Sequence, residues 1–208
     1  YTEPANVRSL LSLGRTQEDT LRHFISSLAL AAMLAGPALA QGDLTADTSL
    51  ARNDRMVRSV FLADLKAVVA DSGHTIDSVG GSGENSVTGV TEDGLIYHMN
   101  GTVCENEIRP GCLGININVR YDGDEMVTYE KLNAANAAWT PVSVAVEGTV
   151  GEVGSTLIIT RYVILDGGMR VENIKENLEN ALSIARDVAD YVWEVGKYAP
   201  DYEGDGEE

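Results

Sequence analysis

Two histidines and one aspartate are the residues of this chain whose types best suit acid–base chemistry. His74 and Asp77 stand three residues apart, and His98 follows in a later segment. An imidazole that a carboxylate orients can act as a general base. No serine or cysteine nucleophile stands in a clear arrangement with these three residues. We therefore name no catalytic residue, and keep a small exported hydrolase or ligand-binding protein using them as an alternative hypothesis.

Two further segments begin like known site motifs, but each lacks a residue that its motif requires. Residues 80–84 lack the last glycine of a serine nucleophile elbow, and Ser86 stands where a dinucleotide fingerprint needs its third glycine. Residues 122–125 begin like a calcium loop, yet Val127 occupies the position where an EF-hand needs glycine. We interpret the first segment as a flexible linker and the second as a solvated turn. No cofactor and no metal site are expected.

The start of the chain contains a pattern typical of a secretory signal peptide. Residues 22–40 begin with Arg22, continue with an apolar stretch, and end in small residues at Ala40. The apolar stretch stops at Gly36, before the roughly 20 residues that a membrane span needs. We predict cleavage after Ala40, a periplasmic or secreted protein, and no membrane span after cleavage.

Cys104 and Cys112 are the only cysteines of the chain. Export would place both in an oxidising compartment, where disulfides persist. We therefore predict a disulfide between them. A zinc site would need more ligands than two thiolates, and neither His74 nor His98 stands at a suitable spacing from them.

The remaining parts of the chain suit a single domain between two polar segments. We expect residues 1–21 to be a wrongly annotated leader, residues 41–53 a flexible lead-in, and residues 54–198 the folded domain. Residues 199–208 are rich in acidic side chains and glycine and are expected to form a disordered tail. The part after position 40 is long enough for one domain and too short for two of ordinary size.

The chain is strongly acidic, with 15 lysines and arginines against 32 aspartates and glutamates and a formal net charge of −17. Because proteins bind phosphate backbones through lysine and arginine, a nucleic-acid partner is not expected. Net charge reports mainly on solubility and does not identify a partner. A third hypothesis is an envelope-stress structural protein that acts through its acidic surface.

The spacing of apolar residues predicts three helices and five strands. One helix is expected from Asp54 to Gly73, and a short one over residues 129–139, begun by Thr128 as N-cap and ended before Pro141. A long amphipathic helix is expected from Val171 to Val192. Alternating residues predict strands at 87–90, 95–103, 113–121, 142–150 and 156–165.

This order of elements predicts an α+β domain with helices packed on a five-stranded antiparallel sheet, in the order α-βββ-α-ββ-α. We expect the two last strands to form a central pair, because both are rich in β-branched residues. In the third strand, Asn116 and Asn118 alternate with apolar residues. Both should therefore lie on the wet face of the sheet, where they are candidate contact residues.

Several of these features together resemble the YbjN family of bacterial proteins, which are labelled sensory transduction regulators. The features are the cysteine-bearing hairpin, the motif Leu132-Asn133-x-x-Asn136, and Gly167-Gly168 before the last helix, within a match from about Asp54 to Trp193. Family members often carry an aromatic residue just before the second asparagine, where this chain has Ala135 and places Trp139 later. The resemblance implies a fold like that of type III secretion chaperones, a homodimer as one assembly, and no established enzymatic activity.

Asn133 and Asn136 lie three residues apart and so share a helix face. We expect both to hydrogen-bond the backbone of a neighbouring strand, in a structural rather than a ligand-binding role. Gly167 and Gly168 should form a tight turn. The leading hypothesis is an exported, non-enzymatic binding or regulatory module that engages a protein partner through its exposed sheet face or through the groove beside its helices.

Mass spectrometry of the exported protein should find a mature chain that begins at Gln41. Reduction should raise its mass by two hydrogen atoms, because the disulfide between Cys104 and Cys112 opens. N-terminal proteomics should find no peptide from residues 2–20 if translation starts at Leu21. Such a peptide would contradict the expected start.

Overall fold

The structure is a computed structural model that describes residues 43–195. The predicted leader, signal peptide and acidic tail lie outside these residues. The described elements are, in chain order, a 3-10 helix η1 (Thr48–Ala51), β1 (Met56–Val57), α1 (Leu62–Asp71), β2 (Thr75–Val79), β3 (Ser86–Val90), β4 (Ile96–Thr102), β5 (Gly114–Asp122), α2 (Tyr129–Ala138), β6 (Ser143–Glu147), β7 (Thr156–Ile164), β8 (Met169–Arg170) and α3 (Val171–Val192).

The main sheet of the α+β domain has six antiparallel strands in the order β2-β3-β4-β5-β7-β6. The prediction of five strands is therefore wrong, because it left out β2. This edge strand exposes Thr75, Asp77 and Ser78, and its pairing with β3 shifts between Ile76 and Ser78. A strand with such an irregular pattern of burial gives only a weak periodic signal.

The last two strands do not form a central pair. β7 lies inside the sheet between β5 and β6, whereas β6 is the edge strand. The β-branched residues of β6 reflect its own burial against neighbouring elements, with Val144 almost fully buried. Composition alone therefore could not place β6 in the order of the sheet.

The first helix begins at Leu62, eight residues later than predicted from Asp54. The backbone N–H of Phe61 donates to Asp64 Oδ2 at 2.8 Å and so fixes the first turn. Val57 belongs to β1, which pairs with β8, and Val60 forms a bridge with Cys112. Both valines are buried, so their spacing resembled a continued helix although the chain there is extended.

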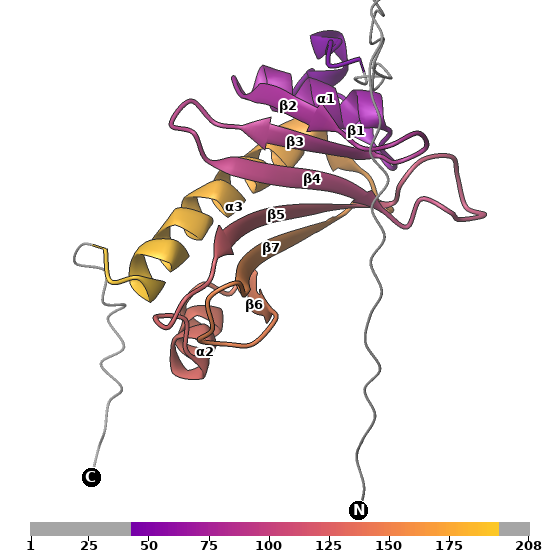
Figure 1. Ribbon diagram of the computed structural model, residues 1–208. Helices are drawn as coiled ribbons and strands as arrows, with labels where there is room; N and C mark the ends of the chain where they lie inside the picture. Colours follow the sequence, from indigo (N-terminus) through magenta and orange to yellow (C-terminus); the bar gives the residue numbers. More distant parts are fainter. Residues whose placement is uncertain (1–42, 196–208) are drawn as a thin grey trace, which may run out of the picture. The chain divides into compact units, whose positions relative to one another are not determined.

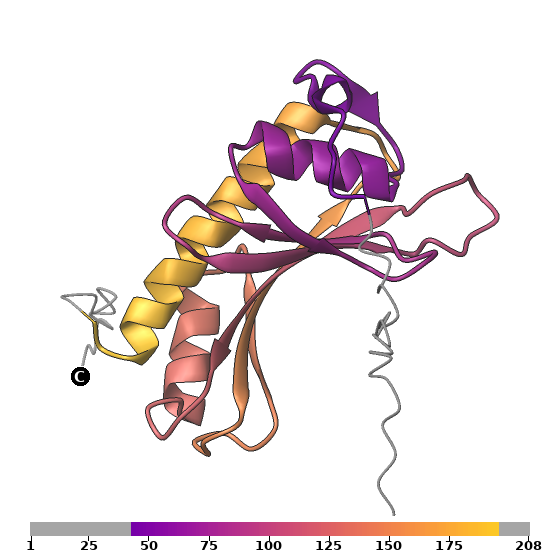
Figure 2. The ribbon, with the colours of Figure 1, turned by 45° about the horizontal axis from the view of Figure 1, so that its top comes forward.

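One face of the sheet is covered by helices and the other is not, within the described residues. Figures 1 and 2 show α3 crossing behind the strands, α1 beside β2 and β3, and α2 next to β6. The predicted apolar stripe of α3 is confirmed, with its side chains packed into the core. Burying one such aliphatic side chain stabilises the fold by about 1.5–3 kcal/mol. The largest fully buried side chains include Leu65, Tyr97, Met99, Ile117, Ile159 and Leu178.

Cys104 and Cys112 form the predicted disulfide and close the loop between β4 and β5. Cys112 is fully buried, and its backbone exchanges two hydrogen bonds with Val60, at 2.9 and 3.0 Å. Closing a loop of this length stabilises the fold by about 2–3 kcal/mol in the chain-entropy account. Val103, next to the disulfide, has a φ of +53°, a conformation that β-branched residues rarely adopt.

The segment before the first strand is partly ordered by the domain. Asp47 Oδ1 accepts from the N–H of Ser49 at 3.0 Å and caps η1, and Ala51 is buried. The almost fully buried Lys66 donates from Nζ to the backbone oxygen of Asp43. No helix within residues 43–195 is both long and apolar enough to cross a bilayer.

The predicted N-cap of α2 is confirmed, because Thr128 Oγ1 accepts from the N–H of Lys131 at 3.2 Å. Asn136 Nδ2 donates to the backbone oxygen of Val144, and the N–H of Val144 donates to Asn136 Oδ1, both at 2.9 Å. Asn136 thus occupies both backbone groups that Val144 turns outward from the sheet edge. Asn136 makes the expected hydrogen bonds to a neighbouring strand, whereas Asn133 makes no such bond to a described residue.

Replacing Asn136 should test this closure of the β6 edge. Asn136→Ala leaves the N–H and C=O of Val144 without their partner, so the free energy of unfolding should fall by about 1–2 kcal/mol. Urea unfolding followed by circular dichroism measures it. Asn133→Ala is the matched control and should change stability by less than about 0.5 kcal/mol. Equal losses in both variants would contradict the edge-closing role.

Candidate functional site

The helix-free side of the sheet, which we call the open face, consists of the even-numbered residues of β3, β4, β5 and β7. Their odd-numbered neighbours are buried under the helices, as in Tyr97 and Met99 of β4. Successive side chains of a strand point to opposite faces, so the even-numbered ones point away from the helices. The predicted placement of Asn116 and Asn118 on the wet face agrees with this alternation.

One row of polar side chains crosses the open face over four strands. Thr88, His98, Asn118 and Thr160 lie directly opposite one another on β3, β4, β5 and β7. The Oγ1 of Thr88 is 3.0 Å from His98 Nδ1, and Thr160 Oγ1 donates to Asn118 Oδ1 at 2.8 Å. We call this set the polar row. Its hydroxyl, imidazole and amide groups can both donate and accept hydrogen bonds.

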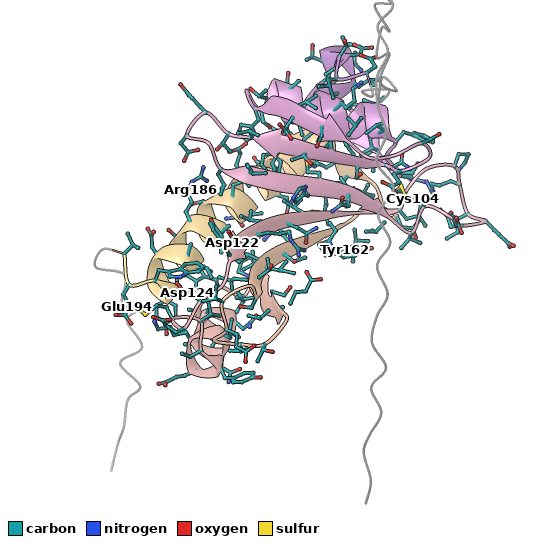
Figure 3. The ribbon with its side chains drawn as sticks, in the orientation of Figure 1. Cys104, Asp122, Asp124, Tyr162, Arg186 and Glu194 are labelled. Atoms are coloured by element: carbon teal, nitrogen blue, oxygen red, sulfur yellow. A yellow bond between two sulfur atoms is a disulfide. The ribbon has the colours of Figure 1, made fainter. Side chains whose placement is uncertain are left out.

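A second row lies beside it, with Asn100 opposite Asn116 and Asn116 opposite Tyr162. Thr102 Oγ1 donates to the hydroxyl of Tyr162 at 3.2 Å, and the side chain of Tyr162 is half exposed. Figure 3 shows Tyr162 at the same end of the sheet as Cys104. Asn116 Oδ1 is buried and accepts no hydrogen bond from the described residues. The centre of the open face therefore contains an acceptor that the fold itself leaves unsatisfied.

Neither row contains an acidic side chain, although the net charge of the chain is −17. The nearest ionised groups lie towards the ends and edges of the strands. Arg120 donates to Glu147 across β5, β7 and β6, and Asp77 lies on the edge strand β2. The two rows therefore form a neutral, polar area on an acidic protein.

Burial lowers the pKa of His98 below its ordinary value of 6.5. The positive charge of Arg120 lowers it further, while Asp77 opposes both effects. His98 is therefore neutral at pH 7 and adds no charge to the polar row.

The structure does not bring His74, Asp77 and His98 into one site. His74 Nδ1 lies 2.8 Å from the hydroxyl of Tyr97, a buried side chain on the helix-covered face. His98 follows Tyr97 in β4 and points to the opposite face. Asp77 is exposed and acts on His98 only through its charge. These three side chains therefore do not form the shared site that the hydrolase hypothesis requires.

A hollow of about 490 Å³ lies beside α3, in the position of the predicted groove next to the helices. Most of its charged groups are already paired with one another. Arg186 Nη2 donates to both carboxylate oxygens of Asp93, at 2.7 and 2.8 Å, and this contact lowers the pKa of Asp93 to about 2. His74 Nε2 is 3.7 Å from Glu179 Oε1. No group of three potential metal ligands occurs within residues 43–195. We interpret the hollow as a structural junction.

The remaining sequence candidates have structural contacts. Asp124, in the predicted solvated turn, accepts from Trp193 Nε1 at 3.1 Å and so holds the end of α3. The ring of Trp139 packs against Tyr191, with centroids 5.6 Å apart. Gly168 has a φ of +93° in the turn after β7, which confirms the tight turn predicted there.

The glycine-rich segment forms a turn between β2 and β3, in which the N–H of Gly81 donates to Glu84 Oε2 at 3.0 Å. The carboxylate of Glu84 thus accepts from a backbone N–H that a phosphate-binding loop would offer to its ligand. The segment therefore gives no sign of a nucleotide site.

Comparison with known proteins gives a family. The YbjN family model, described as "putative bacterial sensory transduction regulator", matches residues 62–194, which is more than half of the chain. The chain belongs to the YbjN family. A comparison with curated proteins finds no match. The match confirms the resemblance drawn from the sequence.

Two solved structures resemble this YbjN-family chain. YbjN from E. coli, whose crystal structure is described as "a putative transcription regulator", is 13% identical, with 64% of this chain and 95% of that chain covered and a TM-score of 0.43. An uncharacterized protein from Methanothermobacter thermautotrophicus is 9% identical, with 62% and 94% covered and a TM-score of 0.47. Likeness at this level carries no conclusion about function.

Two members of the open face, Asn116 and Asn118, were predicted from the sequence, whereas most of the others were not. The alternation of β5 revealed Asn116 and Asn118, but Thr88 and Thr160 join them only through the register of four strands. That register depends on loop lengths and packing, which the alternation of one strand does not contain.

A titration of His98 by NMR should test the electrostatics of the open face. Its pKa should lie below 6.5, Arg120→Gln should raise it, and Asp77→Asn should lower it further, because the two substitutions remove opposite charges. With a lowered folded-state pKa, neutral His98 stabilises the fold fully above pH 6.5. That contribution is lost as the pH falls through the folded-state value. A shift in the same direction in both variants would refute this account.

Proposed function

We propose that this YbjN-family protein is an exported, non-enzymatic binding or regulatory module whose open face engages a protein partner. The observation that supports this most directly is the neutral polar surface formed by the two rows on a protein of net charge −17. Acidic surroundings keep polyanions away, whereas a neutral area permits close approach of another protein surface. Amides and hydroxyls then supply directional hydrogen bonds.

The chemistry of the open face favours a neutral polar protein segment over a small ligand. The two rows cross a broad sheet surface, and the hollow found beside α3 lies on the other side of the strands. Small-molecule sites are usually concave and enclose most of their ligand. A partner that brings hydrogen-bond donors and acceptors would complement the outer groups of the polar row.

Export is part of the proposal. It rests on the signal-peptide pattern of residues 22–40 and agrees with the disulfide between Cys104 and Cys112. Cleavage after Ala40 would also retain Asp43, whose carboxylate and backbone oxygen both contact Lys66. The mature chain would therefore keep every contact of the described domain.

The proposal includes a fold like that of type III secretion chaperones, which the family resemblance implies. A sheet with helices on one face leaves its other face free for a polypeptide, and the open face of this protein has that arrangement. The resemblance contributes the expectation that the ligand is a protein, while the neutral polar rows indicate which surface it contacts.

Site-specific photo-cross-linking in the cell envelope should test the open face. A photoreactive residue in place of Asn118 should give a discrete product, and the same residue in place of the exposed Asn133 on α2 should not. The purified partner should then bind this protein directly. Asn118→Arg should raise the dissociation constant of that complex at least about tenfold, because a bulky charge replaces a neutral amide. Equal cross-linking from both positions, or none from Asn118 across growth conditions, would count against the proposal.

A further inference from the structure

The outer end of β7 is paired on one side only. β6 ends its pairing with β7 where Ser143 lies opposite Thr160, whereas β5 pairs with β7 as far as Ile164. Residues 161–164 therefore have β5 on one side and no strand of residues 43–195 on the other. We call this stretch the free edge.

The register fixes which residues of the free edge turn their backbone groups outward. The N–H of Leu165 donates to the backbone oxygen of Leu113 at 2.9 Å, in line with the pairing of Ile164 and Gly114. Backbone groups of alternate residues in an antiparallel strand point to opposite neighbours. Tyr162 and Ile164 therefore direct their N–H and C=O groups away from β5.

The pairing of β6 with β7 gives the same alternation. Val144 lies opposite Ile159, and both backbone groups of Val144 point away from β7, to Asn136. Ile159 therefore directs its own backbone groups to β5. Outward groups on β7 then belong to the even-numbered residues beyond the end of β6. Outside the pairing of β7 with β5 and β6, no backbone hydrogen bond from the N–H of Tyr162 or Ile164 to a described residue is found.

The same two residues expose apolar side chains. Tyr162 is 50% exposed and Ile164 is 66% exposed. Val103, next to the disulfide, and Ile108, inside the loop that the disulfide closes, are also exposed. Arg109 Nη2 lies 3.5 Å from Asp166 Oδ1, which joins this loop to the turn after β7. The free edge thus combines unpaired backbone with an apolar surround.

The other edges of the sheet are protected. Asn136 occupies the outward groups of Val144 on β6, and β2 carries a register shift beside the exposed Asp77. Bulges, charged residues and covering groups are the usual means by which proteins prevent edge-to-edge pairing. The one charged residue of the free edge, Arg161, turns its side chain to α3, where it donates to Asn177 and Asn180. Among the described residues, no charged side chain therefore covers the outward backbone groups of Tyr162 and Ile164.

We propose that the free edge pairs with the free edge of a second copy of this chain. With a two-fold axis at Val163, Tyr162 of each copy lies opposite Ile164 of the other. Both residues turn their backbone groups outward, so the two edges complete four hydrogen bonds. The pairing also places an aromatic ring beside a β-branched side chain, a favourable cross-strand combination. A surface that complements itself in this way is what a two-fold dimer requires.

The surroundings of the free edge favour a closed dimer over a fibre. Ser143 limits the pairing at one end, and the turn at Gly168 leads the chain away at the other. Tyr162, Ile164, Val103 and Ile108 are uncharged, so two acidic copies can meet there. Their remaining long-range repulsion is screened by salt. This dimer goes beyond the proposed function, because Tyr162 is the only residue of the two rows that belongs to the free edge and the polar row lies outside it.

Sedimentation velocity of the purified, oxidised protein over a concentration series tests the dimer. A reversible monomer–dimer equilibrium is expected, and it should shift toward dimer between about 0.02 M and 0.5 M NaCl as salt screens the like charges. A protein that stays monomeric at every concentration overturns the proposal, and would be the result if the free edge binds a strand of another protein. A dimer that salt weakens also overturns it, because that interface is held by opposite charges.

Two substitutions locate the interface. Ile164→Pro removes an outward N–H that β5 does not use, and should weaken dimerisation at least about tenfold. Ile164→Lys keeps the N–H but adds a charge at the interface, and should have the same effect if the proline variant fails to fold. Ile96→Lys alters another exposed isoleucine of the open face, on β4, and is the matched control. Dimerisation that Ile164→Lys leaves unchanged, or that Ile96→Lys weakens equally, overturns the proposal.

Discussion

The two-residue period of the central strands is the constraint on which the rest of the structure depends. The odd-numbered residues of β5 and β7 are held in the core by α3, because Ile117 and Ile159 pack against its apolar stripe. A shift of one residue in either strand would exchange the two faces of the sheet. The same burial that stabilises the fold therefore fixes the polar side chains on the opposite face. Asn116 and Asn118 are placed there by the packing of their apolar neighbours.

Sequence periodicity predicted those elements whose burial is regular. The long helix α3 and the strand β5 each bury one consistent set of residues, so both were found close to their observed bounds. It failed where tertiary contacts altered the pattern. Val57 and Val60 are buried by a short strand and a bridge, and they mimic an early start of α1. β2 was left out because most of its residues are exposed.

The candidate surfaces were harder to predict than the elements. The polar row requires the pairing of β3, β4, β5 and β7, and the free edge results from a difference in length between β6 and β7. The sequence predicted residues 142–150 for β6, whereas the observed strand is shorter. Val142 and Val150 pack in or against the core although both lie outside the strand. Composition therefore could not reveal where the pairing of β6 with β7 ends. Asn136 was recognised by its spacing, yet only its contact with Val144 explains how one asparagine of the pair protects an edge.

The disulfide has a consequence that follows from Val103. This residue has a left-handed backbone although it is β-branched, and such conformations persist only when the surrounding structure imposes them. Its backbone oxygen accepts from the side chain of Asn106, inside the loop that Cys104 and Cys112 close, and from the N–H of Leu113, just after that loop. Reduction would open that loop and allow Val103 to relax. The local shape of this end of the molecule is therefore linked to the thiol–disulfide balance of its surroundings.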